Sequence, residues 1–262
     1  MQDLRIKATD DLVKKSKLRL LEMHHASKVG HIGGNLSALD ALLLVFHEFL
    51  NAEDRFILSK GHAAGALYIA LWSIGLISDE ELRTFHQDGT RLAGHPPPNS
   101  LPHVDFATGS LGHGLSLAAG TALAMRLKNV AATVFCLTSD GEWQEGSTWE
   151  ALIFAAHQKL SNLLVMIDCN GLQGFGHTNE IASMSGLQGK LSCFDIDVEV
   201  VPGHDLIALR EILSSPRRRP KFIVLETTKG KGVSFMENRM EWHYLPLTDE
   251  LYKNAVQDIQ MS

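Results

Sequence analysis

Residues 132–170 decide the fold, and they read ATVFCLTSDGEWQEGSTWEALIFAAHQKLSNLLVMIDCN. Two apolar runs in this stretch, residues 132–139 and 163–167, have the length and composition of buried strands. Residues 146–160 lie between them and repeat apolar side chains at helical spacing. A strand, a helix and a second strand in this order predict two neighbouring parallel strands that are joined by a right-handed crossover.

The same alternation extends to both sides of this stretch. Apolar runs predict further strands at residues 55–59, 198–201 and 222–225. Spacing and capping residues predict one helix that ends at Gly30 and others at residues 38–50 (with Ser37 as its cap), 63–75, 112–128 and 205–213. Residues 86–110 read as a long loop, and residues 249–262 as a short polar tail. We predict an α/β fold in a single domain over residues 1–262, a doubly wound, mainly parallel sheet with helices on both faces.

The composition excludes several classes of protein. The 262 residues include 24 Lys and Arg and 30 Asp and Glu, and the resulting net charge of −6 argues against nucleic acid or anionic membranes as partners. No apolar run reaches the roughly 18 residues that a membrane span needs, and the polar first residues, MQDLRIK, do not resemble a signal peptide. Cys136, Cys169 and Cys193 form no C-x-x-C pair, so we expect reduced cysteines in a cytoplasmic protein.

Polar side chains follow the two central strands at the point where each strand ends. Asp140-Gly141 follows the first strand, and Asn170-Gly171 follows the second. Because the carboxyl ends of parallel strands meet at one edge of a sheet, we expect Asp140 and Asn170 to lie side by side. Their oxygens suit Mg²⁺ or Ca²⁺, and Mg²⁺ with so few protein ligands also binds phosphate oxygens and water. Either dipeptide alone is equally typical of an ordinary turn, but the pair favours a metal–phosphate site.

A glycine-rich segment and several loop histidines add to this edge of the sheet. Residues 108–114, TGSLGHG, precede a helix and could direct backbone N–H groups at a phosphate. The glycines do not follow the dinucleotide-binding fingerprint, and the chain has no P-loop, H-E-x-x-H or G-x-S-x-G motif. A lone histidine is usually an ordinary surface or core residue. Four in predicted loops, His31, His62, His95 and His243, indicate donors to an anionic ligand or a developing oxyanion.

Taken together, these motifs resemble those of transketolase, a family of thiamine-diphosphate-dependent enzymes. Asp140-Gly141 followed by Asn170 is similar to the thiamine diphosphate motif, G-D-G…N. Further matching segments, in order over roughly residues 8–250, are GHIGG at 30–34, LSKGH at 58–62, GHP at 94–96, TGSLG at 108–112, QEG at 144–146, WE at 149–150 and KGKG at 229–232. The resemblance is strongest to the amino-terminal subunit of split, two-chain transketolases.

The resemblance implies a role for each matching residue. Mg²⁺ would be bound by Asp140, Asn170 and the backbone carbonyl of Leu172. Thiamine diphosphate would be held by His62, Gly109, Ser110, Leu111, Gly141, Asn170 and His243. The ketose donor would be contacted near its carbonyl and first hydroxyl group by His31, His95 and His243. Glu145 and Glu150 match acidic residues at the dimer interface that links two cofactor sites.

The resemblance also implies an activity and a partner. Such an enzyme transfers a two-carbon ketol unit from a ketose, usually phosphorylated, to an acceptor. In this family the catalytic glutamate comes from a pyrimidine-binding domain, which we expect on a carboxy-terminal partner subunit in an α2β2 assembly. The apolar helices at residues 38–46 and 149–156 would supply subunit contacts. Two alternatives stay open: transfer of a glycolyl group to a lipoyl or carrier-protein thiol, and a non-catalytic assembly subunit that binds the cofactor.

Four residues depart from the pattern of the family. Ser139 replaces the first glycine of G-D-G, and Asp105 replaces a glutamate. Phe175 stands where an aspartate usually precedes Gly176, and Tyr244 stands where a glycine usually follows His243. We expect these residues around the cofactor and substrate entrance, where they bear on the choice of substrate rather than on the fold.

Overall fold

The computed structural model describes residues 7–261, in which five parallel strands form one sheet in the order β1-β2-β3-β7-β6. The strands are β1 (Arg55–Leu58), β2 (Val134–Ser139), β3 (Leu163–Cys169), β6 (Asp197–Pro202) and β7 (Lys221–Glu226). β2 and β3 are neighbours, with Val134 opposite Leu163 and Ser139 opposite Asp168. The predicted strands and their parallel pairing are confirmed.

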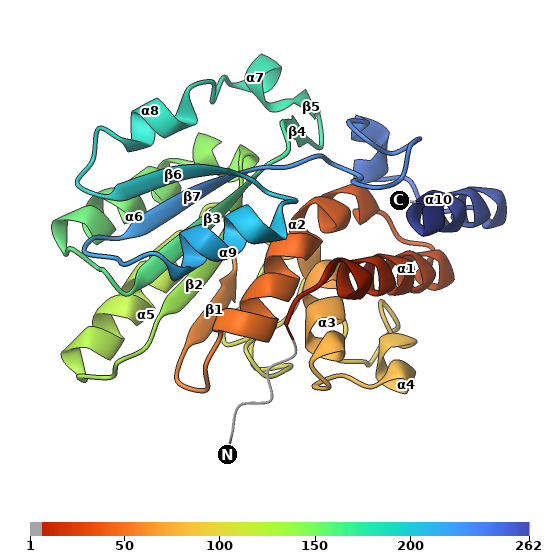
Figure 1. Cartoon of the computed structure of the whole chain (residues 1–262), viewed down its shortest axis with the longest axis horizontal. Helices are drawn as coiled ribbons and strands as arrows, with labels where there is room; N and C mark the ends of the chain where they lie inside the picture. The colour runs from red at the N-terminus through yellow and green to blue at the C-terminus, as the bar shows by residue number, and fades with distance from the viewer. Residues whose placement is uncertain (1–6, 262) are drawn as a thin grey trace.

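Helices cover both faces of this sheet (Figure 1). The core on one face contains residues of α1 (Asp10–Ser27), α2 (Ile32–Leu44), α3 (Ala64–Ser73) and α9 (Leu206–Ser214), and it continues outward to α10 (Asp249–Met261), which packs on α1. The core on the other face contains residues of α5 (Gly114–Leu127), α6 (Gly146–His157) and α8 (Leu187–Leu191). Successive side chains of a strand point to opposite faces. Met166 of β3 therefore lies in the first core, and Val165 and Ile167 lie in the second. The predicted doubly wound α/β fold is confirmed.

Shorter elements connect these layers. They are α4 (Asp79–Leu82), α7 (Thr178–Ile181), the antiparallel pair β4 (Leu172–Gln173) and β5 (Gly176–His177), and single helical turns at Val45–Phe49, Gly61–Ala63, Gly141–Gln144 and Met240–His243. Residues 86–110 contain no helix or strand, as predicted for the long loop.

The sequence-based boundary of α2 is wrong. The helix begins at Ile32 rather than at residue 38, and Ser37 is not its cap but a buried residue inside it. Gly33 and Gly34 have low helix propensity, but the helix is stabilised here because all 13 of its residues are buried. Residues 38–46 therefore lie in the core of this chain, and the predicted role of this helix in subunit contacts is also wrong. The segment Ile32–Phe49 is long and apolar enough to span a membrane, but 89% of it is buried.

The end of the chain also differs from the prediction of a polar tail. Residues from Asp249 onward form α10, which packs along α1. Ala255 and Ile259 are four residues apart, so both lie on one face of the helix and are buried there. Asp249 pairs with His25 (2.8 Å) and Lys28 (3.3 Å) near the end of α1. The polar composition of the segment is that of a surface helix with one narrow apolar stripe.

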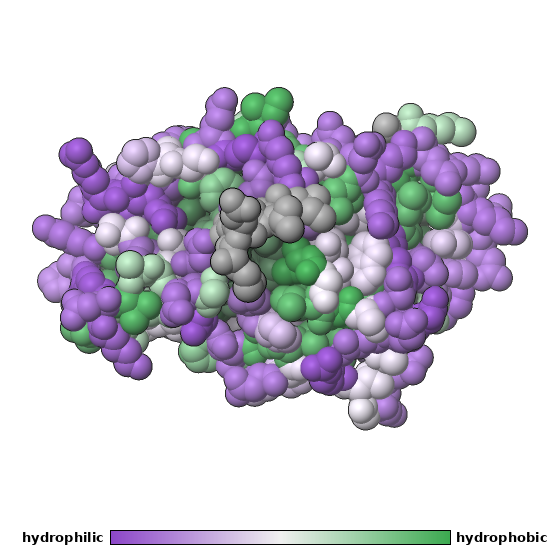
Figure 2. All heavy atoms as spheres, turned by 60° about the horizontal axis from the view of Figure 1, so that its bottom comes forward, coloured by the Kyte–Doolittle hydropathy of each residue, from purple (hydrophilic) through white to green (hydrophobic). Residues whose placement is uncertain are grey.

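The surface is mainly polar, with local apolar areas. Figure 2 shows one face, on which hydrophilic side chains surround a smaller hydrophobic area near the centre. On α6, Ile153 and Phe154 are 54% and 40% exposed. Residues 149–156 therefore have exposed apolar side chains that could contact a partner chain, and this contact stays a prediction.

Candidate active site

A cavity of about 240 Å³ lies at the carboxyl ends of β1, β2, β3 and β7. This is the edge at which open parallel sheets bind their ligands. Its walls include most of the residues that the sequence singled out: His31, His62, His95, Gly109, Leu111, Asp140, Gly141, Asn170, Leu172 and His243. The structure thus brings together residues that are more than 200 positions apart in the chain.

Asp140 and Asn170 lie at the floor of this cavity, one after β2 and the other after β3. Asp140 Oδ2 accepts hydrogen bonds from the backbone N–H of Gly171 (2.8 Å) and from the hydroxyl of Thr178 (3.0 Å). Asn170 Oδ1 accepts from the backbone N–H of Leu172 (3.1 Å). Burial, together with the nearby charge of Asp168, raises the pKa of Asp140. A cation beside Asp140 would offset both effects, so the arrangement fits a bound metal.

Few protein groups in this cavity could bind a metal, so most of its ligands would have to come from elsewhere. Among residues 7–261, no three His, Cys, Asp or Glu side chains cluster as a metal site. Asp140 is the one carboxylate among the described residues that line the cavity. With one carboxylate, one amide oxygen and one carbonyl, Mg²⁺ would need further oxygens from phosphate and water. The residues present therefore fit a metal that is bound together with a diphosphate, and the metal itself stays a prediction.

The predicted histidines form one cluster in the cavity wall. The ring centre of His31 lies 5.6 Å from that of His62, 5.9 Å from that of His95 and 5.0 Å from that of His243. Burial and neighbouring positive charges lower the pKa of His31 to about 4 and that of His243 to about 3. Burial also lowers the pKa values of His62 and His95. All four rings are therefore neutral near pH 7, and each presents one N–H donor and one acceptor nitrogen.

Lys229 determines which nitrogen of His243 carries the proton. The Lys229 ammonium group lies 3.1 Å from His243 Nδ1, which must accept because an ammonium group only donates. The neutral ring of His243 then carries its hydrogen on Nε2, which lies near Gly174 in the cavity wall. Burial and the charge of Lys60 lower the pKa of Lys229 to about 8, so the lysine stays mostly charged at pH 7. The sequence offered Lys229 only as part of a motif, without this role.

The glycine-rich segment enters the site in left-handed backbone conformations. Gly109 has φ +115° and Gly112 has φ +85°, values that side-chain-bearing residues rarely adopt. The buried carboxylate of Glu142 holds the segment in place, because it accepts from the backbone N–H of Gly112 (3.0 Å) and Ser139 (2.8 Å). Ser139, at the first position of the diphosphate motif, is thus part of this support.

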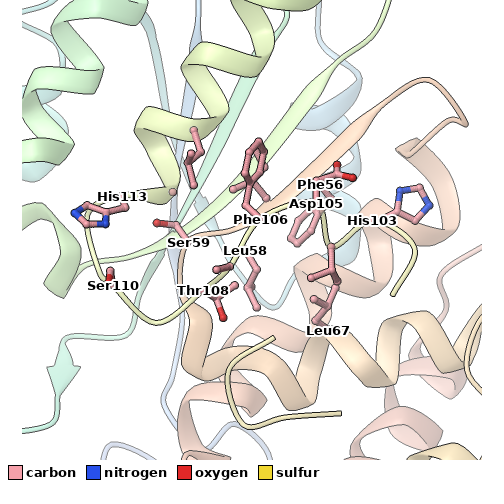
Figure 3. A pocket seen from close by; sticks show the side chains of 15 residues that line it. Phe56, Leu58, Ser59, Leu67, His103, Asp105, Phe106, Thr108, Ser110 and His113 are labelled. Atoms are coloured by element: carbon pink, nitrogen blue, oxygen red, sulfur yellow. The ribbon is translucent and has the colours of Figure 1, made fainter. Parts of the chain in front are cut away.

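Ser110 lies outside the cofactor cavity. It lines a neighbouring cavity of about 330 Å³ between β1, α3 and the start of α5. Figure 3 shows Ser110, Ser59 and His113 at one end of this second cavity and His103 at the other. The carboxylate of Asp105, also in its wall, lies 3.5 Å from Arg55. Phe175 and Tyr244, by contrast, line the cofactor cavity and are 86% and 55% exposed.

A buried ion pair that the sequence did not predict supports the floor of the site. The ammonium group of Lys60 pairs with the carboxylate of Asp168, and both side chains are almost fully buried. Asp168 also accepts hydrogen bonds from the hydroxyl groups of Ser37 (2.6 Å) and Thr227. Burial alone would raise the pKa of Asp168, but Lys60 and these donors hold it below its usual value. The pair joins β1, β3, β7 and α2 directly beneath the cavity.

We expect Lys60→Met to destabilise the protein by about 3–5 kcal/mol, because it leaves the Asp168 carboxylate buried without its counter-ion. Urea unfolding followed by circular dichroism measures the loss. The matched control is Lys231→Met, which removes an exposed pair with Glu237 (3.5 Å) and should cost about 0–1 kcal/mol. Equal losses for the two variants would contradict the supporting role of the buried pair.

Comparison with known proteins identifies the family of this fold and site. The family described as "Transketolase, thiamine diphosphate binding domain" matches residues 10–261. The chain belongs to the transketolase family. It is 36% identical over 258 residues to one of the subunits of the apulose-4-phosphate transketolase of Phocaeicola vulgatus, covering 94% of this chain and 92% of that protein. It is 35% identical over 257 residues to the 6-deoxy-6-sulfo-D-fructose transketolase subunit SqwG of Clostridium sp. (strain MSTE9), covering 93% and 94%.

Solved transketolases have the same fold over nearly all of this chain. The transketolase from Leishmania mexicana superimposes with a TM-score of 0.89 at 26% identity, over 97% of this chain and 42% of that one. The transketolase from Campylobacter jejuni gives 0.85 at 28% identity, over 95% and 43%. The chain thus spans less than half the length of these transketolases. The predicted family, a transketolase subunit that depends on thiamine diphosphate, is confirmed.

Proposed function

We propose that this chain is the cofactor-binding subunit of a two-chain transketolase that transfers a ketol unit from a ketose phosphate to an acceptor. The observation that carries the proposal is the joint placement of Asp140, Asn170 and four neutral histidines around one cavity. Relatives that this chain matches over more than 90% of their length are named as single subunits of transketolases, which supports a second chain as partner. The partner would supply the pyrimidine-binding domain and the catalytic glutamate.

In this proposal, the diphosphate of the cofactor and the rest of the cofactor would contact different residues of the cavity. The oxygens of Asp140 and Asn170 and the carbonyl of Leu172 would bind Mg²⁺, with Ca²⁺ as an alternative, and thereby the diphosphate. His62, Gly109, Leu111 and Gly141 line the same cavity and would hold the rest of the cofactor on this chain. Ser110 does not line this cavity, so it would act on the cofactor only by holding its neighbours Gly109 and Leu111 in place. When bound, thiamine diphosphate supplies the carbanion chemistry that breaks the C–C bond of the donor.

The histidines would carry out the proton transfers at the ketose. A neutral histidine near pH 7 can donate to the donor carbonyl oxygen or accept the proton of the hydroxyl group that is lost in C–C cleavage. His243 presents Nε2–H because Lys229 donates to its Nδ1, so His243 is suited to donate a hydrogen bond to the carbonyl oxygen of the ketose. His31 and His95 complete the part of the cavity wall that would contact the ketose.

Calorimetry with thiamine diphosphate tests the proposed cofactor site. We expect binding to the isolated chain when Mg²⁺ is present and none when the metal is removed with EDTA, because the diphosphate and Asp140 repel each other without a cation between them. Binding that does not depend on the metal would contradict the proposed arrangement.

We expect His31→Ala to reduce kcat by about 10²–10⁴-fold and to leave the Kd for thiamine diphosphate nearly unchanged, because His31 acts on the donor. His62→Ala should weaken cofactor binding as well, since His62 belongs to the cofactor side of the cluster. Steady-state kinetics of the two-chain enzyme and calorimetry of the isolated chain measure the two effects. Equal effects of the two changes on cofactor affinity would contradict this division of roles.

We further propose an α2β2 assembly in the cytoplasm. Glu145 and Glu150 are exposed on and beside α6, in a position to meet a neighbouring chain. Cys136, Cys169 and Cys193 are all free thiols, which suits a reducing compartment. Sedimentation analysis of the co-purified chains would give the stoichiometry.

A further inference from the structure

A second, smaller cavity of about 40 Å³ lies behind the site histidines. His31, His62 and His95 line both this cavity and the cofactor cavity, so their rings form the wall between the two. His24 and His86 line only the rear cavity. Whatever occupies the rear cavity can therefore reach the sides of the site histidines that face away from the substrate.

His24 presents an unpaired acceptor to this cavity. Its Nδ1 lies 3.4 Å from the backbone carbonyl of Val29, so Nδ1 carries the hydrogen and donates it. Burial lowers the pKa of His24 to about 4, and the ring is neutral. Nε2 is then an acceptor, and it has no hydrogen-bond partner in the described part of the chain. A buried polar atom without a partner costs about 1–3 kcal/mol, which a small ligand in the cavity would recover.

Two glycines, Gly65 and Gly94, leave space beside the Nε2 atoms of His24 and His86. A Cβ atom at Gly65 would lie 2.6 Å from His24 Nε2, and one at Gly94 would lie 2.6 Å from His86 Nε2. The remaining volume of about 40 Å³ exceeds the roughly 10–15 Å³ that one water molecule needs, so the cavity has room for a water molecule. A metal ion is not favoured, because the described histidines form no group with the geometry of a metal site.

We propose that one ordered water molecule in this cavity donates a hydrogen bond to His24 Nε2 and bonds to the ring nitrogen of His31 that faces away from the substrate, so that His24 is a positioning residue for the ketose donor. The proposal rests on the proposed function for the role of His31. A hydrogen bond at the rear ring nitrogen of His31 restricts rotation of the ring, and so holds the other ring nitrogen in one direction toward the substrate. His24 also holds the backbone at Val29, two residues before His31, whose own φ of +68° is strained.

A crystal structure of the chain gives the direct test. We expect one ordered water within about 2.7–3.2 Å of His24 Nε2. An empty cavity, or a protein group that donates to this nitrogen, would overturn the proposal. This readout does not depend on catalysis. It also separates failure of the water site from failure of the proposed function, which would appear as a chain that does not bind thiamine diphosphate with Mg²⁺.

Kinetics of the two-chain enzyme test the positioning role. In His24→Leu, which has no acceptor, kcat/KM for the ketose donor should fall by about tenfold to a hundredfold, because small displacements of a catalytic group have effects of this size. The Kd for thiamine diphosphate should stay unchanged. His24→Gln, whose amide oxygen can accept from the same water, should recover most of the loss.

The matched control is His47→Leu, which removes another buried histidine, one that bonds to Ser73 (2.8 Å) away from both cavities. It should lower thermal stability without changing kcat/KM. The positioning role is excluded if His24→Leu and His47→Leu have equal effects on kcat/KM, if cofactor affinity falls as much as turnover, or if His24→Gln is no better than His24→Leu.

Discussion

Asp140→Asn is expected to abolish binding of thiamine diphosphate while leaving the fold intact. The change removes the one carboxylate in the described wall of the cofactor cavity, and with it the negative charge that would bind Mg²⁺. Loss of a residue that only supports a metal ligand typically costs about 10–100-fold in affinity, so loss of the ligand itself should cost about a hundredfold or more. Calorimetry with Mg²⁺ and thiamine diphosphate measures the change in Kd.

The stability of Asp140→Asn shows whether a loss of cofactor binding comes from the missing metal ligand or from unfolding. Burial and Asp168 raise the pKa of Asp140 in the folded chain, which means that the ionised carboxylate is disfavoured there at pH 7. The asparagine has no charge and keeps one oxygen to accept from Gly171 and Thr178, but its NH2 group replaces the oxygen that accepts from the backbone N–H of Gly141 (2.8 Å). These effects oppose each other, so the melting temperature without cofactor should stay close to that of the parent.

Asp195→Asn, which alters a surface aspartate paired with Arg219 (2.6 Å), is the matched control and should leave cofactor affinity unchanged. If Asp140→Asn bound the cofactor as tightly as the parent, the metal site would lie elsewhere.

The sheet and much of the site could be predicted from the sequence because the relevant signals are local. Each of the five segments predicted as a strand forms one, and parallel strands bring the residues that follow them to one edge of the sheet. Asp140 and Asn170 could therefore be placed side by side without knowledge of any contact. The four loop histidines could be grouped as candidate donors because each lies in a predicted loop. Their separate roles came only from the resemblance to the family, since no spacing rule connects His31 with His243.

The parts that could not be predicted depend on long-range packing. Lys60 and Asp168 are 108 positions apart, and nothing near either residue indicates that each is buried against the other. The start of α2 was missed because Gly33 and Gly34 favour a loop, and the helix forms there only because the surrounding core buries it. The segment of α10 is mostly polar, and its narrow apolar stripe, Ala255 and Ile259, is buried only because α1 packs beside it.

The isolated chain is expected to have no significant ketol transfer activity, even when it is saturated with cofactor. Bound thiamine diphosphate would need a catalytic carboxylate to become active, which the resemblance to the family assigns to the partner subunit. Asp140 is the one carboxylate in the described cavity wall, and it would already bind the metal. Without a positioned acid–base group, the rate should be lower by about 10²–10⁴-fold. Leu111, Phe175 and Tyr244 also leave this side of the cavity exposed to water until another surface covers it.

The measurement is a titration of the chain, at fixed Mg²⁺, thiamine diphosphate and ketose donor, with the proposed partner chain. Activity should rise with added partner and reach its plateau at one partner per chain, as the proposed α2β2 assembly requires. A partner whose catalytic glutamate is changed to glutamine should bind equally well and restore no activity, which separates the missing carboxylate from simple coverage of the cavity. Rapid ketol transfer by the isolated chain would show that its own residues complete the site, and the two-chain proposal would then be wrong.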